Sequence, residues 1–217
     1  MKKRIFSILA AALVFSLAAC GSTTDPGSAE DAEQQTAAST QTDSPEMAGG
    51  TSAAEPEADG GTLIAYFSWS GNTEQMAQAI RTETGGDLYQ IEPAVPYTDD
   101  YDALLDIAQQ EQAENARPEL ASTVENWDSY DVIFVGYPNW WSDAPMAVYT
   151  FLEAYDFTGK TLIPFNTSAS GGFGRSLSGI EESAAGANIL EGLALTEGEL
   201  GNVQGEVSSW LAGLRLT

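Results

Sequence analysis

The sequence contains no histidine and only one cysteine among its 217 residues. Without histidine the chain cannot form a Ser-His-Asp triad, a histidine-ligated zinc site or an imidazole general base. A single cysteine excludes an intrachain disulfide and any cysteine cluster for zinc or an iron–sulfur centre. We therefore expect no metal in this protein.

Positive charge is also scarce. The chain has 8 Lys and Arg residues and 32 Asp and Glu residues, which gives a net charge of −24. Nucleic-acid binding needs a basic surface, so we expect no nucleic-acid partner. A negative field of this size would instead steer basic proteins toward the molecule. The acidity extends into the folded region, since residues 62–217 carry 23 acidic and 5 basic residues.

The first 20 residues have the pattern of an export signal. A basic start, Met1-Lys2-Lys3-Arg4, precedes an apolar stretch that ends in Leu17-Ala18-Ala19-Cys20. The stretch is too short for an ordinary membrane span. It resembles a bacterial lipoprotein signal, which implies removal of residues 1–19, a lipid on Cys20 and anchoring at the extracytoplasmic face of the cell membrane. A secretory signal with a chance cysteine is the alternative.

The next segment lacks the residues that build a core. Residues 21–60 contain no Val, Ile, Leu, Phe, Trp or Tyr. Such a composition cannot bury enough apolar surface to offset the entropy lost on ordering. We predict that residues 20–61 form a disordered acidic tether, with a recognition segment for another protein as the alternative, and that residues 62–217 form the folded domain.

Expected strands and helices alternate from residue 62 onward. The expected strands are residues 62–68, 87–93, 128–138, 159–168 and 189–195, and the expected helices are residues 73–84, 101–116, 144–157, 174–187 and 203–214. Five short apolar strands, each followed by a helix, predict an open parallel sheet covered on both faces. Ligands of such folds bind beyond the carboxyl ends of the strands. The loops after the first, third and fourth strands are therefore the places to search.

The loop after the first strand reads SWSGNT, residues 68–73. It offers hydroxyl and amide side chains together with the N–H groups of a helix start, where the helix dipole adds partial positive charge. No Lys or Arg lies between Leu63 and Ile80, so this is not a Walker A motif and nucleoside-triphosphate hydrolysis is not expected. The loop predicts a site for a small dianion, with an ordinary helix cap as the alternative.

The loop after the third strand carries two adjacent tryptophans, Trp140 and Trp141. Adjacent indoles in a polar loop suggest a flat ligand stacked on a ring, although they could instead pack over the sheet edge. The loop after the fourth strand is rich in glycine, but its glycines do not fit the G-x-G-x-x-G dinucleotide fingerprint.

Three segments together resemble a bacterial flavodoxin: YFSWSGNTEQMA, VGYPNWW and APMAVYTFLEAYDFTGKTLIPFNTSASGGFGRS. The resemblance covers residues 62–214, and the chain departs from the flavodoxin phosphate-loop pattern only at Ala65, immediately before the first segment. It implies an α/β protein with a flavodoxin-like three-layer α/β/α sandwich, a five-stranded parallel sheet in the order 2-1-3-4-5, and FMN as cofactor.

The resemblance also implies which residues bind the cofactor. The phosphate would be held by Ser68, Ser70, Gly71, Asn72 and Thr73, with the backbone of Trp69. One face of the isoalloxazine ring would be covered by Pro138, Asn139, Trp140, Trp141 and Ser142, with Trp140 or Trp141 stacked on it. The other side and the polar edge would be lined by Thr167, Ser168, Ala169, Ser170, Gly171, Gly172, Phe173 and Gly174.

Many flavodoxins place a glycine in the loop after the third strand. Here residues 137–143 contain none, and Ser142 stands near the expected position. A positive φ is unfavourable for serine, because its Cβ crowds the backbone.

As a function, the resemblance implies a monomeric electron carrier that shuttles electrons between redox partner proteins. We assign no catalytic residue, because the chemistry belongs to the cofactor. One alternative is an FMN-dependent NAD(P)H or quinone reductase on the same fold. A nicotinamide phosphate would need basic residues near the flavin, and only Arg175 lies in the three loops. The other alternative is a lipoprotein that binds a different small ligand without redox chemistry.

Overall fold

The computed structural model describes residues 60–214. The predicted signal segment, Cys20 and the predicted tether up to residue 59 lie outside the described residues. Within residues 60–214, no helix combines the length and the apolar character that a membrane crossing requires.

The sheet is parallel and has the predicted strand order. Its strands are β1 (Gly61–Tyr66), β2 (Asp87–Gln90), β3 (Tyr130–Pro138), β4 (Thr161–Ser168), β5 (Asn188–Ile189) and β6 (Leu193–Thr196). The order is β2-β1-β3-β4-β5, and β6 also pairs with β4. The flavodoxin-like topology 2-1-3-4-5 is therefore confirmed, with two short strands sharing the fifth position.

Two short strands, β5 and β6, stand where a single strand was expected at residues 189–195. β5 pairs with Thr161 and Leu162, whereas β6 pairs with residues 165–168. The gap lies opposite Pro164, which has no N–H to offer a neighbouring strand. Gly192 passes so close to this proline that a Cβ would lie 2.5 Å from the Pro164 carbonyl oxygen.

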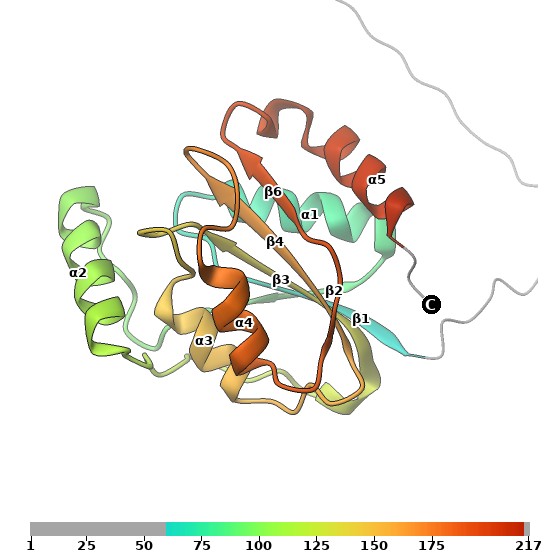
Figure 1. Ribbon diagram of the computed structural model, residues 1–217, viewed down its shortest axis with the longest axis horizontal. Helices are drawn as coiled ribbons and strands as arrows, with labels where there is room; N and C mark the ends of the chain where they lie inside the picture. The colour runs from blue at the N-terminus through green and yellow to red at the C-terminus, as the bar shows by residue number, and fades with distance from the viewer. Residues whose placement is uncertain (1–59, 215–217) are drawn as a thin grey trace, which may run out of the picture. The chain divides into compact units, whose positions relative to one another are not determined.

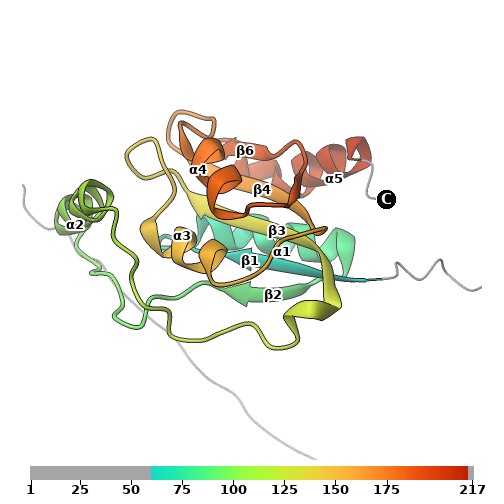
Figure 2. The ribbon, with the colours of Figure 1, turned by 60° about the horizontal axis from the view of Figure 1, so that its bottom comes forward.

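Helices cover both faces of the sheet. α1 (Asn72–Thr84) and α5 (Val203–Gly213) lie on one face, and α3 (Met146–Glu153) and α4 (Ser176–Ser183) lie on the other (Figures 1 and 2). Consecutive residues of β1 alternate between the two cores, with Leu63 and Ala65 facing α3 and α4 while Ile64 and Tyr66 face α1 and α5. This period-two alternation gives the three layers.

The remaining helix, α2 (Tyr101–Glu114), does not cover a face of the sheet. It stands apart from the other helices, at the left of Figure 1, and it buries only Leu104 and Ala108. Ile107, also on this helix, is 37% exposed. The helix is fixed at its start by the side chain of Asp100, which accepts a hydrogen bond from the N–H of Ala103 (2.8 Å).

Aromatic side chains near the start of β3 pack against the core. Trp127, from the short 3-10 helix Trp127–Ser129, stacks on Tyr155 with 4.4 Å between ring centroids, and it meets Phe157 edge to face with 4.9 Å between centroids. The Tyr155 hydroxyl also accepts a hydrogen bond from the N–H of Val124 (2.6 Å). These residues fix the long connection between α2 and β3 onto the core.

In the centre of the sheet, the backbone of β3 lies so close to a side chain of β4 that only glycine fits. Gly136 on β3 pairs with Phe165 on β4, and a Cβ at Gly136 would lie 2.0 Å from the Phe165 ring. We expect Gly136→Ala to lower the free energy of unfolding by about 1–3 kcal/mol, the cost of overpacking a core. Urea denaturation followed by tryptophan fluorescence measures this. Gly201→Ala is the control, because nothing lies within 4 Å of its Cβ position. Equal stability of the two variants would contradict the prediction.

Candidate functional site

The three loops singled out in the sequence meet at the carboxyl edge of the sheet. The hydroxyls of Thr73, after β1, and Thr167, at the end of β4, share a hydrogen bond of 2.8 Å. Asn139, after β3, donates its backbone N–H to the Thr167 carbonyl (2.8 Å) and its side-chain amide to the Gly172 carbonyl (3.2 Å). Residues far apart in the sequence are thus brought into one site.

The loop after β1 presents unpaired donors. Gly71 is the N-cap of α1, has a φ of 88° and has no side chain with which to cap the helix. The Ser68 hydroxyl accepts the N–H of Glu74 (3.2 Å), while residues 72 and 73 lie in the first turn, where an α-helix offers no carbonyl partner. Ser70 is exposed beside them. These N–H groups and the helix dipole suit a dianion without any Lys or Arg.

The Thr73–Thr167 pair fixes the start of α1 to the end of β4. Both side chains are buried, with Thr73 and Thr167 only 1% and 4% exposed. One hydroxyl donates to the other, so the pair keeps one hydroxyl hydrogen for a further acceptor.

The loop after β3 forms a tight turn over Trp140, Trp141, Ser142 and Asp143. Trp140 and Asp143 exchange both backbone hydrogen bonds, at 2.8 and 3.0 Å. Trp141 and Ser142 have φ values of 51° and 63°, the pattern of a type I′ turn that normally carries Asn-Gly. The unfavourable positive φ anticipated for Ser142 is present, and Trp141 shares it. The left-handed conformation costs roughly 1–2 kcal/mol for each such residue.

The two tryptophans of the turn have different surroundings. Trp140 is half-buried, and its ring meets Phe67 and Tyr97 edge to face, at 5.2 and 5.3 Å between centroids. Trp141 is 48% exposed, and its indole N–H donates to the carbonyl of Leu105 on α2 (3.0 Å).

A cavity of about 310 Å³ lies between α2 and the loops after β1 and β3. It is lined by Trp69, Tyr101, Leu104, Leu105, Ala108, Asn139, Trp140 and Trp141; we call it the tryptophan cavity. The indole of Trp69 donates to the Thr98 carbonyl (2.9 Å), so this residue both supports its loop and lines the cavity. Aromatic walls of this kind suit a flat ring system.

Four lining residues of the tryptophan cavity, all on α2, were not predicted as site residues. They are Tyr101, Leu104, Leu105 and Ala108. The apolar spacing of α2 identifies a buried face, but it does not tell whether that face meets the sheet or a ligand site.

The loop after β4 is shaped by glycine. Gly171, Gly172 and Gly174 have φ values of 78°, 83° and 60°, and Ala169 and Ser170 between β4 and these glycines are exposed. A Cβ on Gly174 would lie 2.3 Å from the Ser142 carbonyl oxygen, so only glycine lets the two loops approach.

Two polar atoms near the end of β4 are buried without a protein partner. Within residues 60–214, neither the Ser168 hydroxyl nor the Oδ1 atom of Asn166 has a hydrogen-bond partner. Burying such atoms is costly unless something else bonds to them. The end of β4 is therefore suited to a polar ligand group or a water molecule.

Two predicted site residues lie at the margin. Pro138, the last residue of β3, pairs in register with Thr167 and is half-buried. The centroid of the Phe173 ring lies 6.5 Å from that of the Tyr137 ring. Phe173 also lines a separate groove beside α4, together with Leu177 and Gly192. The Phe173 side chain is thus not in the tryptophan cavity, and its role in binding stays a prediction.

The sequence profile of the flavodoxin family matches residues 61–213. The chain belongs to the flavodoxin family. No curated protein sequence matches it.

Solved structures of similar chains agree with this membership. A flavoprotein candidate from Bacteroides eggerthii is 34% identical, with a TM-score of 0.64, over 72% of this chain and 99% of its own. A second candidate, from Bacteroides uniformis, is 33% identical with a TM-score of 0.62, over 70% and 98%. A flavoprotein from Lactobacillus acidophilus in complex with FMN is 26% identical with a TM-score of 0.56, over 70% and 99%.

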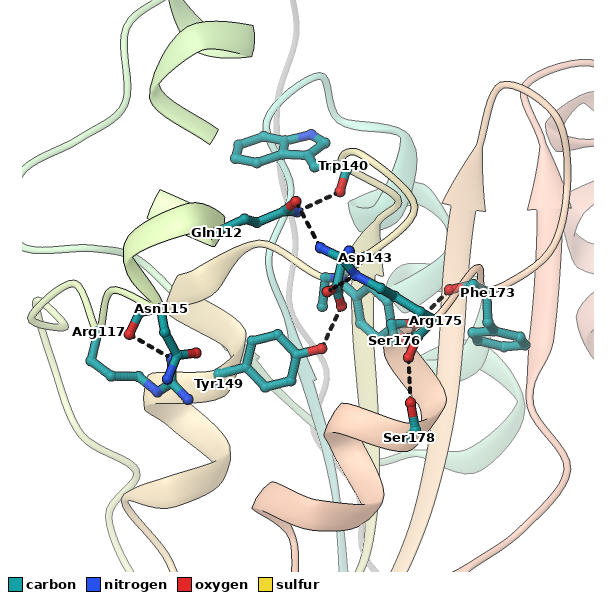
Figure 3. Close-up of polar contacts among 12 residues, drawn as sticks. Gln112, Asn115, Arg117, Trp140, Asp143, Tyr149, Phe173, Arg175, Ser176 and Ser178 are labelled. Atoms are coloured by element: carbon teal, nitrogen blue, oxygen red, sulfur yellow. Dashed lines mark hydrogen bonds and ion pairs between the residues drawn. The ribbon is translucent and has the colours of Figure 1, made fainter. Parts of the chain in front are cut away.

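A second, polar cavity of about 440 Å³ lies on the other side of the turn in this flavodoxin-family chain (Figure 3). Arg117 there donates two hydrogen bonds of 2.7 Å to Glu153, which holds the pKa of the Glu153 carboxyl below its usual value. Arg175 pairs with Asp143 at 2.7 Å. Both arginines of the polar cavity are thus already engaged by carboxylates.

The Tyr97 ring that contacts Trp140 is tied to α2. Its hydroxyl donates to the carboxylate of Glu111 (2.7 Å). Burial raises the pKa of Glu111, and the hydrogen bond from Tyr97 opposes this shift. This bond and the Trp141–Leu105 bond attach α2 beside the tryptophan cavity.

Proposed function

We propose that this protein binds FMN at the carboxyl edge of its sheet and carries electrons between redox partner proteins. One observation carries the proposal: a loop that offers hydrogen-bond donors without a cation lies beside a cavity walled by three tryptophans. The relative from Lactobacillus acidophilus, crystallised with FMN, supports this choice of ligand.

The donors of the first loop fit a phosphate monoester. The N–H groups of residues 70–73 and the hydroxyls of Ser68, Ser70 and Thr73 would bond its oxygens, with the amide of Asn72. Converging donors and a helix N-terminus can hold a dianion without a basic side chain.

The tryptophan cavity fits the flat ring of a flavin. Trp69, Trp140 and Trp141 would face the ring, and the buried hydroxyl of Ser168 would meet a polar group at its edge. FMN would supply the one- and two-electron chemistry of a flavin. The carboxylates around this edge oppose added negative charge, which favours a low reduction potential.

The reductase alternative is less well supported. The cations close to the turn, Arg117 and Arg175, are paired with Glu153 and Asp143, so binding a nicotinamide phosphate would have to displace a carboxylate. Steady-state oxidation of NAD(P)H by the FMN-loaded protein discriminates between the two functions.

FMN titration of the chain from residue 21 onward tests the central proposal. We expect strong quenching of flavin fluorescence, because tryptophans line the cavity. Gly71→Ala should weaken FMN binding about tenfold, because the free loop would leave the left-handed conformation, which costs alanine roughly 1–2 kcal/mol, and FMN binding would have to restore it; 1.4 kcal/mol is tenfold.

Gly85→Ala is the matched control for this titration. Gly85 has a φ of 69° at the opposite end of α1, and nothing lies within 4 Å of its Cβ position. It should lower stability but leave FMN affinity unchanged. A wild-type protein that leaves FMN fluorescence unquenched would remove the basis for the function and favour the non-redox alternative.

We also propose that redox partners dock at this edge through basic surfaces. Asp99, Asp100 and Asp102 lie at the start of α2, and the neighbouring Tyr101 is 60% exposed at the tryptophan cavity. Opposite charge on a partner would steer it toward the flavin.

Electron transfer from the FMN-loaded, reduced protein to cytochrome c, used as a basic probe, tests the docking surface. Replacing Asp99 and Asp102 together by Asn should slow the second-order rate by about twofold to tenfold at low salt and by little at high salt. Asp100 is left in place because it caps α2. The control replaces Glu125 by Gln and Asp128 by Asn, next to the start of β3. An equal effect of both pairs would argue against a defined docking surface.

We further propose that a lipid on Cys20 anchors the protein at the extracytoplasmic face of the cell membrane. The proposal rests on the basic, apolar and LAAC pattern of residues 1–20. Metabolic labelling with palmitate in a bacterial host should label the wild type but not Cys20→Ser. Labelling that survives this substitution would place the modification elsewhere.

A further inference from the structure

The carboxylate of Asp143 is the centre of a set of bonds around the turn of residues 140–143. Its Oδ1 atom accepts hydrogen bonds from the Tyr149 hydroxyl and from the N–H of Ala144 (2.8 Å). Its Oδ2 atom accepts the Nε–H of Arg175 (2.7 Å). The Asp143 side chain is only 14% exposed. The last residue of the turn is therefore attached to α3 and to the start of α4.

Other contacts hold the rest of the turn. The carbonyl of Trp140 accepts a hydrogen bond from Nε2 of Gln112 on α2 (2.7 Å), and the carbonyl of Ser142 accepts the N–H of Arg175 (2.8 Å). The Arg175 guanidinium also donates to Oε1 of Gln112 (3.2 Å). Figure 3 shows Gln112, Asp143 and Arg175 grouped beside the Trp140 carbonyl.

Asp143 lines the polar cavity and not the tryptophan cavity. It does not line the tryptophan cavity itself, so it acts on the shape of that cavity through the backbone of the turn. The central residues of that turn, Trp141 and Ser142, have φ values that non-glycine residues avoid. Such a conformation persists only when surrounding contacts impose it.

We propose that Asp143 is a positioning residue that holds Trp141 and Ser142 in the left-handed conformation and thereby shapes the flavin site. The proposal rests on the FMN-binding function proposed above. When the bonds to Asp143 are broken, the turn of the free protein populates other conformations. FMN affinity then falls in proportion to the fraction of molecules that keep the competent turn.

Asp143→Asn tests this role. Asparagine keeps the size of the side chain and one acceptor oxygen, but its NH₂ group faces the Arg175 Nε–H and cannot accept it. We expect about tenfold weaker FMN binding, the equivalent of 1.4 kcal/mol. The visible absorption spectrum of the bound FMN should shift. In NMR spectra of the free protein, the indole N–H resonance of Trp141 should also shift.

Glu153→Gln is the matched control. Like Asp143, Glu153 is an arginine-paired carboxylate that lines the polar cavity. It lies on α3, and its bonds go to Arg117 and Ser183 rather than to the turn. It should leave FMN affinity, the flavin spectrum and the Trp141 resonance unchanged.

A second substitution separates positioning from general stability. Glycine adopts a positive φ without steric cost, so Ser142→Gly added to Asp143→Asn should restore most of the lost affinity. No rescue, or wild-type affinity and spectra in Asp143→Asn alone, would overturn the proposal. Should Asp143→Asn fail to fold, Arg175→Ala removes the same Oδ2 bond from an exposed side chain, and the same outcomes apply.

The two proposals fail in different ways. If the wild type does not bind FMN, the proposed function fails. The Trp141 resonance of the free protein still tests the role of Asp143, because it requires no ligand. An unshifted resonance in Asp143→Asn would overturn the positioning role even if FMN binds the wild type.

Discussion

The parallel pairing of β1, β3 and β4 is the interaction on which the rest of the structure depends. β3 pairs with both neighbours along most of its length, so all three strands end at the same edge. The loops that follow them meet there without long connections, and bonds such as Thr73–Thr167 join them. Backbone pairing, rather than attraction between charged side chains, brings the donors of the site together.

The position of α2 decides what kind of site this edge becomes. Because α2 lies beside the loops, its residues Leu104 and Leu105 form a wall of the tryptophan cavity. Its Leu105 carbonyl and Gln112 side chain also hold the Trp140–Asp143 turn. The aromatic group around Trp127, which precedes β3, packs against the core instead. One helix thus serves the binding edge instead of the hydrophobic core.

Most of the fold could be predicted from the sequence, since apolar runs of strand length between helical spacings leave few topologies. The split of the last strand could not, because it depends on Pro164 in a neighbouring strand. The three loops could be located, but not the lining contributed by α2, since periodicity shows a buried face and not its partner. The roles of Asp143 and Gln112 depend on contacts between distant segments, which their local sequence does not encode. Serine at position 142 suggests an unfavourable positive φ. Only the structure shows that Trp141 also has a positive φ, and which contacts hold both residues in that conformation.

The divided fifth strand also has a consequence for how molecules meet one another. The outer strand of a sheet presents unpaired N–H and C=O groups that can recruit another chain. Here that border consists of two residues in β5 and four in β6, separated by a gap at Pro164 and Gly192. A partner strand finds no long, continuous ladder on this side. On this side of the sheet, neighbouring copies thus have little template for edge-to-edge aggregation.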